Sequence, residues 1–168
     1  MYKKSVFLSL ILATIGVLAC SGSSSGDKSD YWDLSAEIIA EHASTQIKLG
    51  PAPSFDPREG PAETVITIRV GELRVAAAEF NALRFRWEAQ TPPSDFAIHY
   101  DLVTQILERS NASMSFAVQA FEEMSRQVQL PVPDTEPANI LIRQSETALA
   151  EANAFASAAN RERDRIKS

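Results

Sequence analysis

The chain has 168 residues, and its 16 basic and 22 acidic side chains give a formal net charge of −6. This length allows a single domain with its own hydrophobic core. An acidic chain without a Lys/Arg cluster excludes nucleic acid as an expected partner, because contacts to phosphate dominate that kind of binding. Cys20 is the only cysteine, so neither an internal disulfide nor a cysteine-based zinc site is expected.

The first 19 residues have the composition of an export signal. Lys3 and Lys4 form a short basic start, and residues 5–19 are apolar and uncharged. Fifteen such residues suffice for the hydrophobic region of a signal peptide, but a membrane-spanning helix needs about 20. We therefore expect residues 1–19 to be a signal peptide rather than a transmembrane anchor.

The signal ends in Val17-Leu18-Ala19-Cys20, with an aliphatic residue three positions before the cysteine and a small residue directly before it. This run resembles the lipobox of bacterial lipoproteins. The resemblance implies cleavage between Ala19 and Cys20, attachment of lipid to the Cys20 thiol, and anchoring of the mature chain to a membrane. Ser21 after the cysteine resembles lipoproteins directed to the outer membrane in bacteria that have two membranes.

Residues 20–29 read CSGSSSGDKS, which predicts a flexible lipidated tether. A tether of this length holds the following domain, residues 30–168, within about 30 Å of the membrane surface. Removal of Lys3 and Lys4 leaves 14 basic against 22 acidic side chains, so the mature chain is more acidic than the precursor.

Four segments of residues 30–168 show the three-to-four-residue spacing of apolar side chains that is typical of amphipathic helices. The first is predicted from an N-cap at Asp30 to Leu49, before Gly50-Pro51. The side chains expected on its apolar face are Tyr31, Leu34, Ile38, His42, Thr45 and Leu49.

The second helix is predicted over residues 62–90, after a Pro-rich loop at 51–61. Its apolar face recurs every seven residues, with other apolar side chains between: Ile66, Val70, Leu73, Ala77, Phe80, Leu83 and Trp87. Residues 65–70 are β-branched and partly alternating, which also fits a strand. We choose helix because the seven-residue spacing continues through them and no second strand-like run is available for pairing.

The third helix is predicted over 95–129, between Pro92-Pro93 and Pro131. Its face alternates four- and three-residue steps: His99, Val103, Ile106, Ser110, Ser113, Ala117, Ala120 and Met124. The fourth is predicted over 136–166, capped by Asp134 or Thr135, with a face rich in small residues: Leu141, Ser145, Ala148, Ala152, Phe155, Ala159 and Ile166. Together these segments predict an all-α, antiparallel up-down bundle of three long helices and one shorter N-terminal helix; a three-helix core crossed by the first helix is the alternative.

The sequence contains no motif of a known catalytic or nucleotide-binding site. The two histidines, His42 and His99, have no metal-binding spacing, so no metal or cofactor is expected. His99 and Trp87 lie about equally far from Pro92-Pro93, so we expect them to face each other across the turn, either as a small pocket or, as we prefer, as packed core residues.

These observations predict a non-enzymatic, lipid-anchored module of the cell envelope. It would act by protein–protein interaction or as a structural element, at the periplasmic side or at the cell surface, with an envelope protein as partner. The alternative is a carrier of a small apolar ligand, held between the helices near the small residues Ser110–Ser113 and Ala148–Ala152. Cys20 is the single expected modification site.

Overall fold

The structure is a computed structural model and describes residues 26–49, 62–130 and 134–168. It contains α1 (Gly26–Leu49), α2 (Ala62–Glu88), a single 3₁₀ turn η1 (Ser94–Phe96), α3 (Ala97–Val128) and α4 (Glu136–Lys167). Within these described ranges there is no strand, and the predicted all-α bundle is confirmed. The predicted signal peptide and the loop at 51–61 lie outside the described residues.

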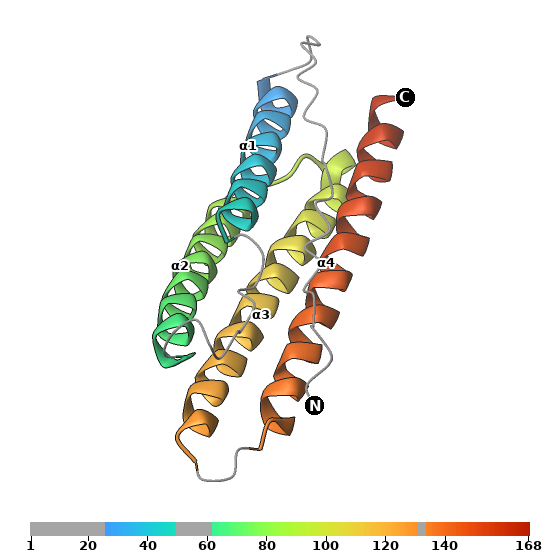
Figure 1. Cartoon of the computed structure of the whole chain (residues 1–168). Helices are drawn as coiled ribbons and strands as arrows, with labels where there is room; N and C mark the ends of the chain where they lie inside the picture. Colours follow the sequence, from blue (N-terminus) through green and yellow to red (C-terminus); the bar gives the residue numbers. More distant parts are fainter. Residues whose placement is uncertain (1–25, 50–61, 131–133) are drawn as a thin grey trace.

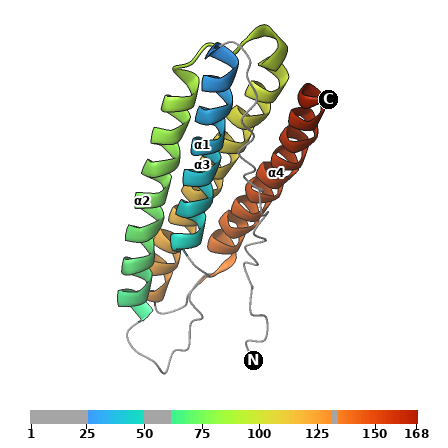
Figure 2. The same cartoon turned by 90° about the horizontal axis from the view of Figure 1, so that it is seen from above.

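The four helices run alternately in opposite directions (Figures 1 and 2), so that α1 and α3 are parallel to each other and antiparallel to α2 and α4. The middle of the assembly is α3, which packs against α2 on one side and α4 on the other, while α1 packs mainly on α2. At 24 residues α1 is shorter than α3 and α4, which have 32 each. The predicted up-down order is therefore present, rather than a first helix crossing a three-helix core.

The helix α2 includes the β-branched run at residues 65–70, as predicted. Its inward positions Ile66, Leu73, Phe80 and Trp87 are all at most 3% exposed. Helical spacing places these four side chains on one face, and burying them outweighs the modest strand preference of the β-branched residues.

Two of the three residues between those four positions differ from the prediction. Val70 and Ala77 are only half-buried, and Arg69 and Ala76 are buried in their place, whereas Leu83 is buried as predicted. The seven-residue spacing identifies the face of the helix correctly, but in its first half the buried intermediate residues, Arg69 and Ala76, each come one position earlier than predicted. A guanidinium group therefore lies where an apolar side chain was expected.

The start of α1 also differs from the prediction. The helix begins at Gly26, so Asp30 lies inside it and the cap predicted at Asp30 is wrong. Residues 26–29, assigned from sequence to the tether, form the first turn. An ion pair between Lys28 Nζ and Asp95 Oδ2 at 3.0 Å joins this turn to η1, which gives the polar run a partner within the bundle.

Two apolar clusters of different character meet on α3. Large side chains fill the space between α1, α2 and α3: Ile38, Leu73, Phe80, Trp87, Val103, Leu107 and Met114. Between α3 and α4 the buried residues of α4 are small: Ala138, Ser145, Ala148, Ala152, Ala156 and Ala159. Small side chains allow two helix backbones to approach closely, and alanine also favours the helix itself.

We predict that Phe80→Ala destabilises the domain by about 3–5 kcal/mol, because a fully buried phenyl ring leaves a cavity. Phe85 is the matched control, since it lies in the same helix but is 59% exposed, and Phe85→Ala is expected to cost less than about 1 kcal/mol. Urea unfolding of each variant in a Cys20→Ser background measures both values. Similar losses for the two variants would contradict the position of α2 in the bundle.

Candidate functional site

The residues that the sequence singles out for modification, Ala19 and Cys20, lie outside the described part of the chain. The first described residue is Gly26, at the end of the bundle where α4 also finishes (Figure 1). The site that the structure does describe begins at this end and extends along the interface of α1 and α3.

Two buried hydrogen bonds join α1 to α3, each between an imidazole and a hydroxyl group. Tyr31 Oη lies 2.7 Å from His99 Nδ1, and His42 Nε2 lies 2.7 Å from Ser110 Oγ. The pairs are reciprocal, because α1 supplies the hydroxyl of the first and the imidazole of the second. All four side chains are at most 7% exposed. Buried polar groups need such partners, since an unpaired one costs about 1–3 kcal/mol.

The two pairs share one register. In each of them the partner on α3 follows the residue on α1 by 68 positions, and the surface pair of Lys28 with Asp95 has nearly the same separation, 67. A constant separation is what two parallel helices with a fixed longitudinal alignment produce. Buried polar contacts specify register in helical bundles because any other alignment leaves them unpaired.

Both imidazoles are neutral at physiological pH. Burial lowers the pKa of His42 to about 4. Burial also lowers the pKa of His99 to about 4, with a further lowering by Arg163 and an opposing effect of Glu162, both on α4. Burial, assisted by Tyr100 and Asp101, raises the pKa of Tyr31 above its usual value. The phenol therefore keeps its proton, which it can donate to the neutral imidazole.

The contact between Ser110 and His42 has the geometry of a nucleophile beside a general base, which is the first requirement for hydroxyl activation. A substrate would also have to reach the hydroxyl, and Ser110 is only 1% exposed, beneath α1. The imidazole of His42 in addition packs on Phe80, with 4.7 Å between the ring centroids. These surroundings favour a structural role for the pair.

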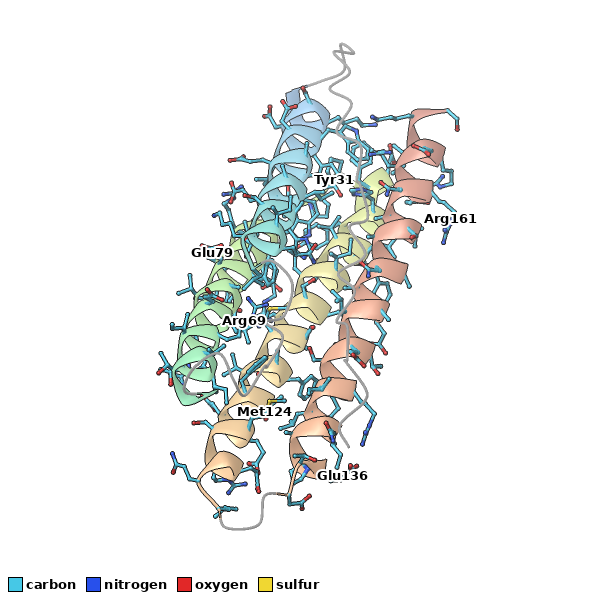
Figure 3. All side chains as sticks on the ribbon, viewed as in Figure 1. Tyr31, Arg69, Glu79, Met124, Glu136 and Arg161 are labelled. Carbon is cyan, nitrogen blue, oxygen red and sulfur yellow. The ribbon has the colours of Figure 1, made fainter. Side chains whose placement is uncertain are left out.

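An aromatic cluster surrounds Tyr31 at the end where α1 begins (Figure 3). Tyr31 stacks on Phe96 with 4.9 Å between centroids, and Trp32 meets both Phe96 and His99 edge-on. The ammonium group of Lys167, from the end of α4, lies 5.5 Å from the centroid of Trp32. Edge-to-face and cation–π contacts of this kind contribute stability in addition to the apolar area that the rings bury.

Trp87 and His99, which were predicted to face each other directly, each contact the ring of Tyr31 instead. The Tyr31 ring lies 5.5 Å from Trp87 and 5.8 Å from His99, measured between centroids. Trp87 also stacks on Tyr100 and donates its indole N–H to Thr104 Oγ1 at 3.1 Å. Both residues belong to the core, as preferred. Sequence reasoning missed the central ring because it comes from α1, which is distant in the chain.

Ser113 and Ser145 connect α3 to α4 in the region where a ligand was the alternative prediction. Their hydroxyl oxygens are 3.1 Å apart, and Ser145 Oγ donates to the Ser113 carbonyl at 2.9 Å. The helices are thus in direct contact at this height, so a ligand there would have to displace this hydrogen-bonded pair. The carrier function stays a prediction.

Arg69 was not singled out from the sequence, although it is 6% exposed. Its guanidinium Nη1 donates to the carbonyl of Leu49 at 2.5 Å, at the end of α1, and pairs with Glu72 at 3.0 Å. Figure 3 shows Arg69 beside that end of α1. A cation is favoured at the carbonyl end of a helix, where the macrodipole is negative. A basic residue within an otherwise apolar stripe is the signal that could have identified it.

Of the surface hollows beside the described helices, two contain charged side chains. One, of about 420 Å³, lies between α1 and α2 and is lined by side chains of both charges, including Glu41, Lys48, Glu79 and Arg86. The other, of about 350 Å³, lies between α3 and α4 and contains Arg109 and Arg143. Both arginines already form ion pairs, with Glu151 and Glu136 respectively.

Across residues 26–49, 62–130 and 134–168, no three His, Cys, Asp or Glu side chains gather as a metal site would require. None of the helices in these ranges combines the length and apolar character that crossing a bilayer requires. Comparisons of the chain with protein-family models, curated proteins and solved structures find no match.

The two buried histidines predict that acid begins to destabilise the domain at pH values higher than those at which carboxylates take up protons. The unfolded chain binds protons below its ordinary imidazole pKa of 6.5, whereas the folded chain binds them only near 4. The contribution of the two histidines to the free energy of unfolding is therefore complete above pH 6.5 and is lost as the pH falls toward 4. Near pH 5.2 the free energy of unfolding changes by up to about 2.7 kcal/mol per pH unit for the two together.

Urea unfolding between pH 5 and 7 measures this slope. The variant His42→Gln/His99→Gln keeps a side chain that can hydrogen-bond but cannot titrate, so its stability should change little over the same range. An equal slope in the variant and in the native sequence would show that the imidazoles are not the groups responsible.

Proposed function

We propose that this chain is a lipoprotein of the bacterial cell envelope. In this proposal acyl chains on Cys20 hold the helical bundle at a membrane surface, where it acts through contacts with envelope proteins. The observation that carries the proposal is the run Val17-Leu18-Ala19-Cys20 at the end of an uncharged apolar segment, with the only cysteine of the chain at its last position.

The position of α1 determines which end of the bundle lies near Cys20. Five residues separate Cys20 from Gly26, and a chain of this length spans at most about 20 Å. In the proposal, the end of the bundle that carries Tyr31, η1 and the end of α4 therefore faces the membrane. Two or three acyl chains make such attachment effectively permanent, whereas one chain does not.

The surface of the bundle supports action through protein contacts. Large apolar side chains are exposed on several helices, and three of them, Ile68, Val75 and Phe85, lie on α2 with about 60% of each side chain exposed. Single exposed apolar residues are ordinary, but several along one helix are typical of an interaction surface.

Metabolic labelling with a palmitate analogue tests the anchor. We expect the native chain, produced in a bacterium, to carry the label and to sediment with membranes, and the Cys20→Ser variant to lose both properties. A matched control moves the cysteine by four positions, Cys20→Ser/Ser24→Cys, which keeps the thiol but removes it from the Ala19 junction. This control should also remain unlabelled.

The proposal would be overturned by a native chain without label. It would equally fail if the Cys20→Ser protein sedimented with membranes as completely as the native protein, because attachment would then not depend on the acyl chains.

A further inference from the structure

The helix α2 has a second apolar face that points away from the bundle. This outer face consists of six exposed residues whose spacing alternates three and four: Ile68, Gly71, Val75, Ala78, Ala82 and Phe85. It carries no charge over nearly five turns of helix. The inward face of α2 is already buried against α1 and α3, so α2 is apolar on two opposite sides. A helix of that kind is expected to be covered on both.

No other part of the described chain covers the three large side chains of the outer face. Ile68 is 59% exposed, Val75 60% and Phe85 59%. Charged residues border the face on both sides: Glu72, Glu79 and Arg86 toward α1, and Arg74 toward α3, where it pairs with Glu122. The outer face is thus an apolar stripe between two charged edges, which is the pattern of one strand of a coiled coil.

Gly71 gives an independent indication that another helix packs here. A glycine in the middle of a helix costs roughly 1 kcal/mol relative to alanine. A Cβ added at Gly71 would meet nothing within 4 Å, so packing inside the chain does not require the glycine. Close approach of a second backbone to the outer face is a reason for a residue without a side chain at this position.

We propose that the outer face of α2 pairs with the same face of a second copy of this chain, with the two α2 helices parallel. In this arrangement Ile68, Val75 and Ala82 occupy the a positions of the heptad, and Gly71, Ala78 and Phe85 occupy the d positions. Each residue then meets its own counterpart. β-branched residues at a positions favour two-stranded pairing, and the small residues bring the backbones together.

The charges on the edges select the parallel direction. In a parallel pair each g position faces the e position five residues further along the second helix, which brings Arg74 opposite Glu79 of the second copy, twice by symmetry. In an antiparallel pair centred on the same face, Glu72 would lie opposite Glu79 of the second copy, and like charges repel. In the single chain, Arg74 pairs with Glu122 and Glu79 accepts a hydrogen bond from Thr45 at 2.6 Å, so these two groups would rearrange or share partners.

The anchor selects the same direction, and this step rests on the proposed function. Two copies held in one membrane through Cys20 both have the Gly26 end of the bundle near that membrane, which a parallel pair allows. A single pair of helices is a small interface for free proteins. Confinement to a membrane raises the effective concentration of the two copies and favours association without new contacts.

Cysteine crosslinking of the lipidated full-length chain in membranes tests the proposal. In the Ala82→Cys variant, two new thiols meet in the parallel pair, whereas the antiparallel pair separates them by about 16 Å along the axis, too far for a disulfide. Ala150→Cys is the matched control, because Ala150 is also an exposed helical alanine but lies on α4. We expect mild oxidation to give several-fold more disulfide-linked dimer from Ala82→Cys than from the control.

Further variants in the Ala82→Cys background separate this pairing from random collision. Val75→Glu should reduce the dimer to the level of the control. Arg74→Glu and Glu79→Arg should each reduce it, and the two together should restore it, because the double reversal re-creates the pair of opposite charges between copies. Circular dichroism of each variant checks that the bundle is folded.

Equal crosslinking of Ala82→Cys and Ala150→Cys would overturn the proposal, as would a double reversal that restores nothing. Palmitate labelling of the same samples distinguishes the two levels of inference. A labelled chain without specific crosslinking contradicts the pairing alone, whereas an unlabelled chain contradicts the anchored function on which the parallel direction rests.

Discussion

The alignment of α1 on α3 depends on two buried hydrogen bonds, Tyr31 with His99 and His42 with Ser110. A slide of α1 by one helical turn would leave four buried polar groups without these partners, at about 1–3 kcal/mol for each. The apolar contacts alone discriminate less, because apolar side chains recur about once per turn along each inward face and can pack again one turn away. The polar pairs therefore favour the alignment in which all four groups have a partner.

This alignment also determines the ends of the molecule. It places the first turn of α1 beside η1 and the end of α4, where Lys28 meets Asp95 and Lys167 lies over Trp32. If Cys20 carries lipid, the membrane-facing end of the bundle is thus defined in part by an interaction about four turns further along α1, at His42. Fold and orientation would then have a common physical cause.

Much of this fold follows from the sequence. Four helices, their order and most of their bounds were predicted because heptad spacing and proline breaks are local signals. Residues 65–70 were correctly assigned to a helix because the spacing continues through them. The start of α1 was not, since the tether composition of residues 26–29 conceals the contact of Lys28 with a residue 67 positions away. Arg69 was missed because spacing fixes a helical face only to within about one residue.

The buried pairs could not be predicted for a related reason. His42, His99, Ser110 and Tyr31 were each placed on an inward face, but spacing along one helix contains no information on the partner in another. The equal 11-residue steps from Tyr31 to His42 and from His99 to Ser110 become meaningful only once α1 and α3 are known to be parallel neighbours. The outer face of α2 likewise required knowledge of which side of that helix the bundle covers.

A distance between spin labels on α1 and α3 tests most directly whether the polar pairs fix the alignment. Labels at Ala40→Cys and Gln119→Cys, both exposed positions, in a Cys20→Ser background should give one narrow distribution by electron paramagnetic resonance. With both pairs replaced by apolar residues (Tyr31→Phe, His99→Leu, His42→Leu and Ser110→Ala), we expect a folded bundle whose distribution broadens or gains a component displaced by about one turn, 5.4 Å along the axis. An unchanged narrow distribution in that variant would contradict the claim, because the apolar contacts alone would then be sufficient to align α1.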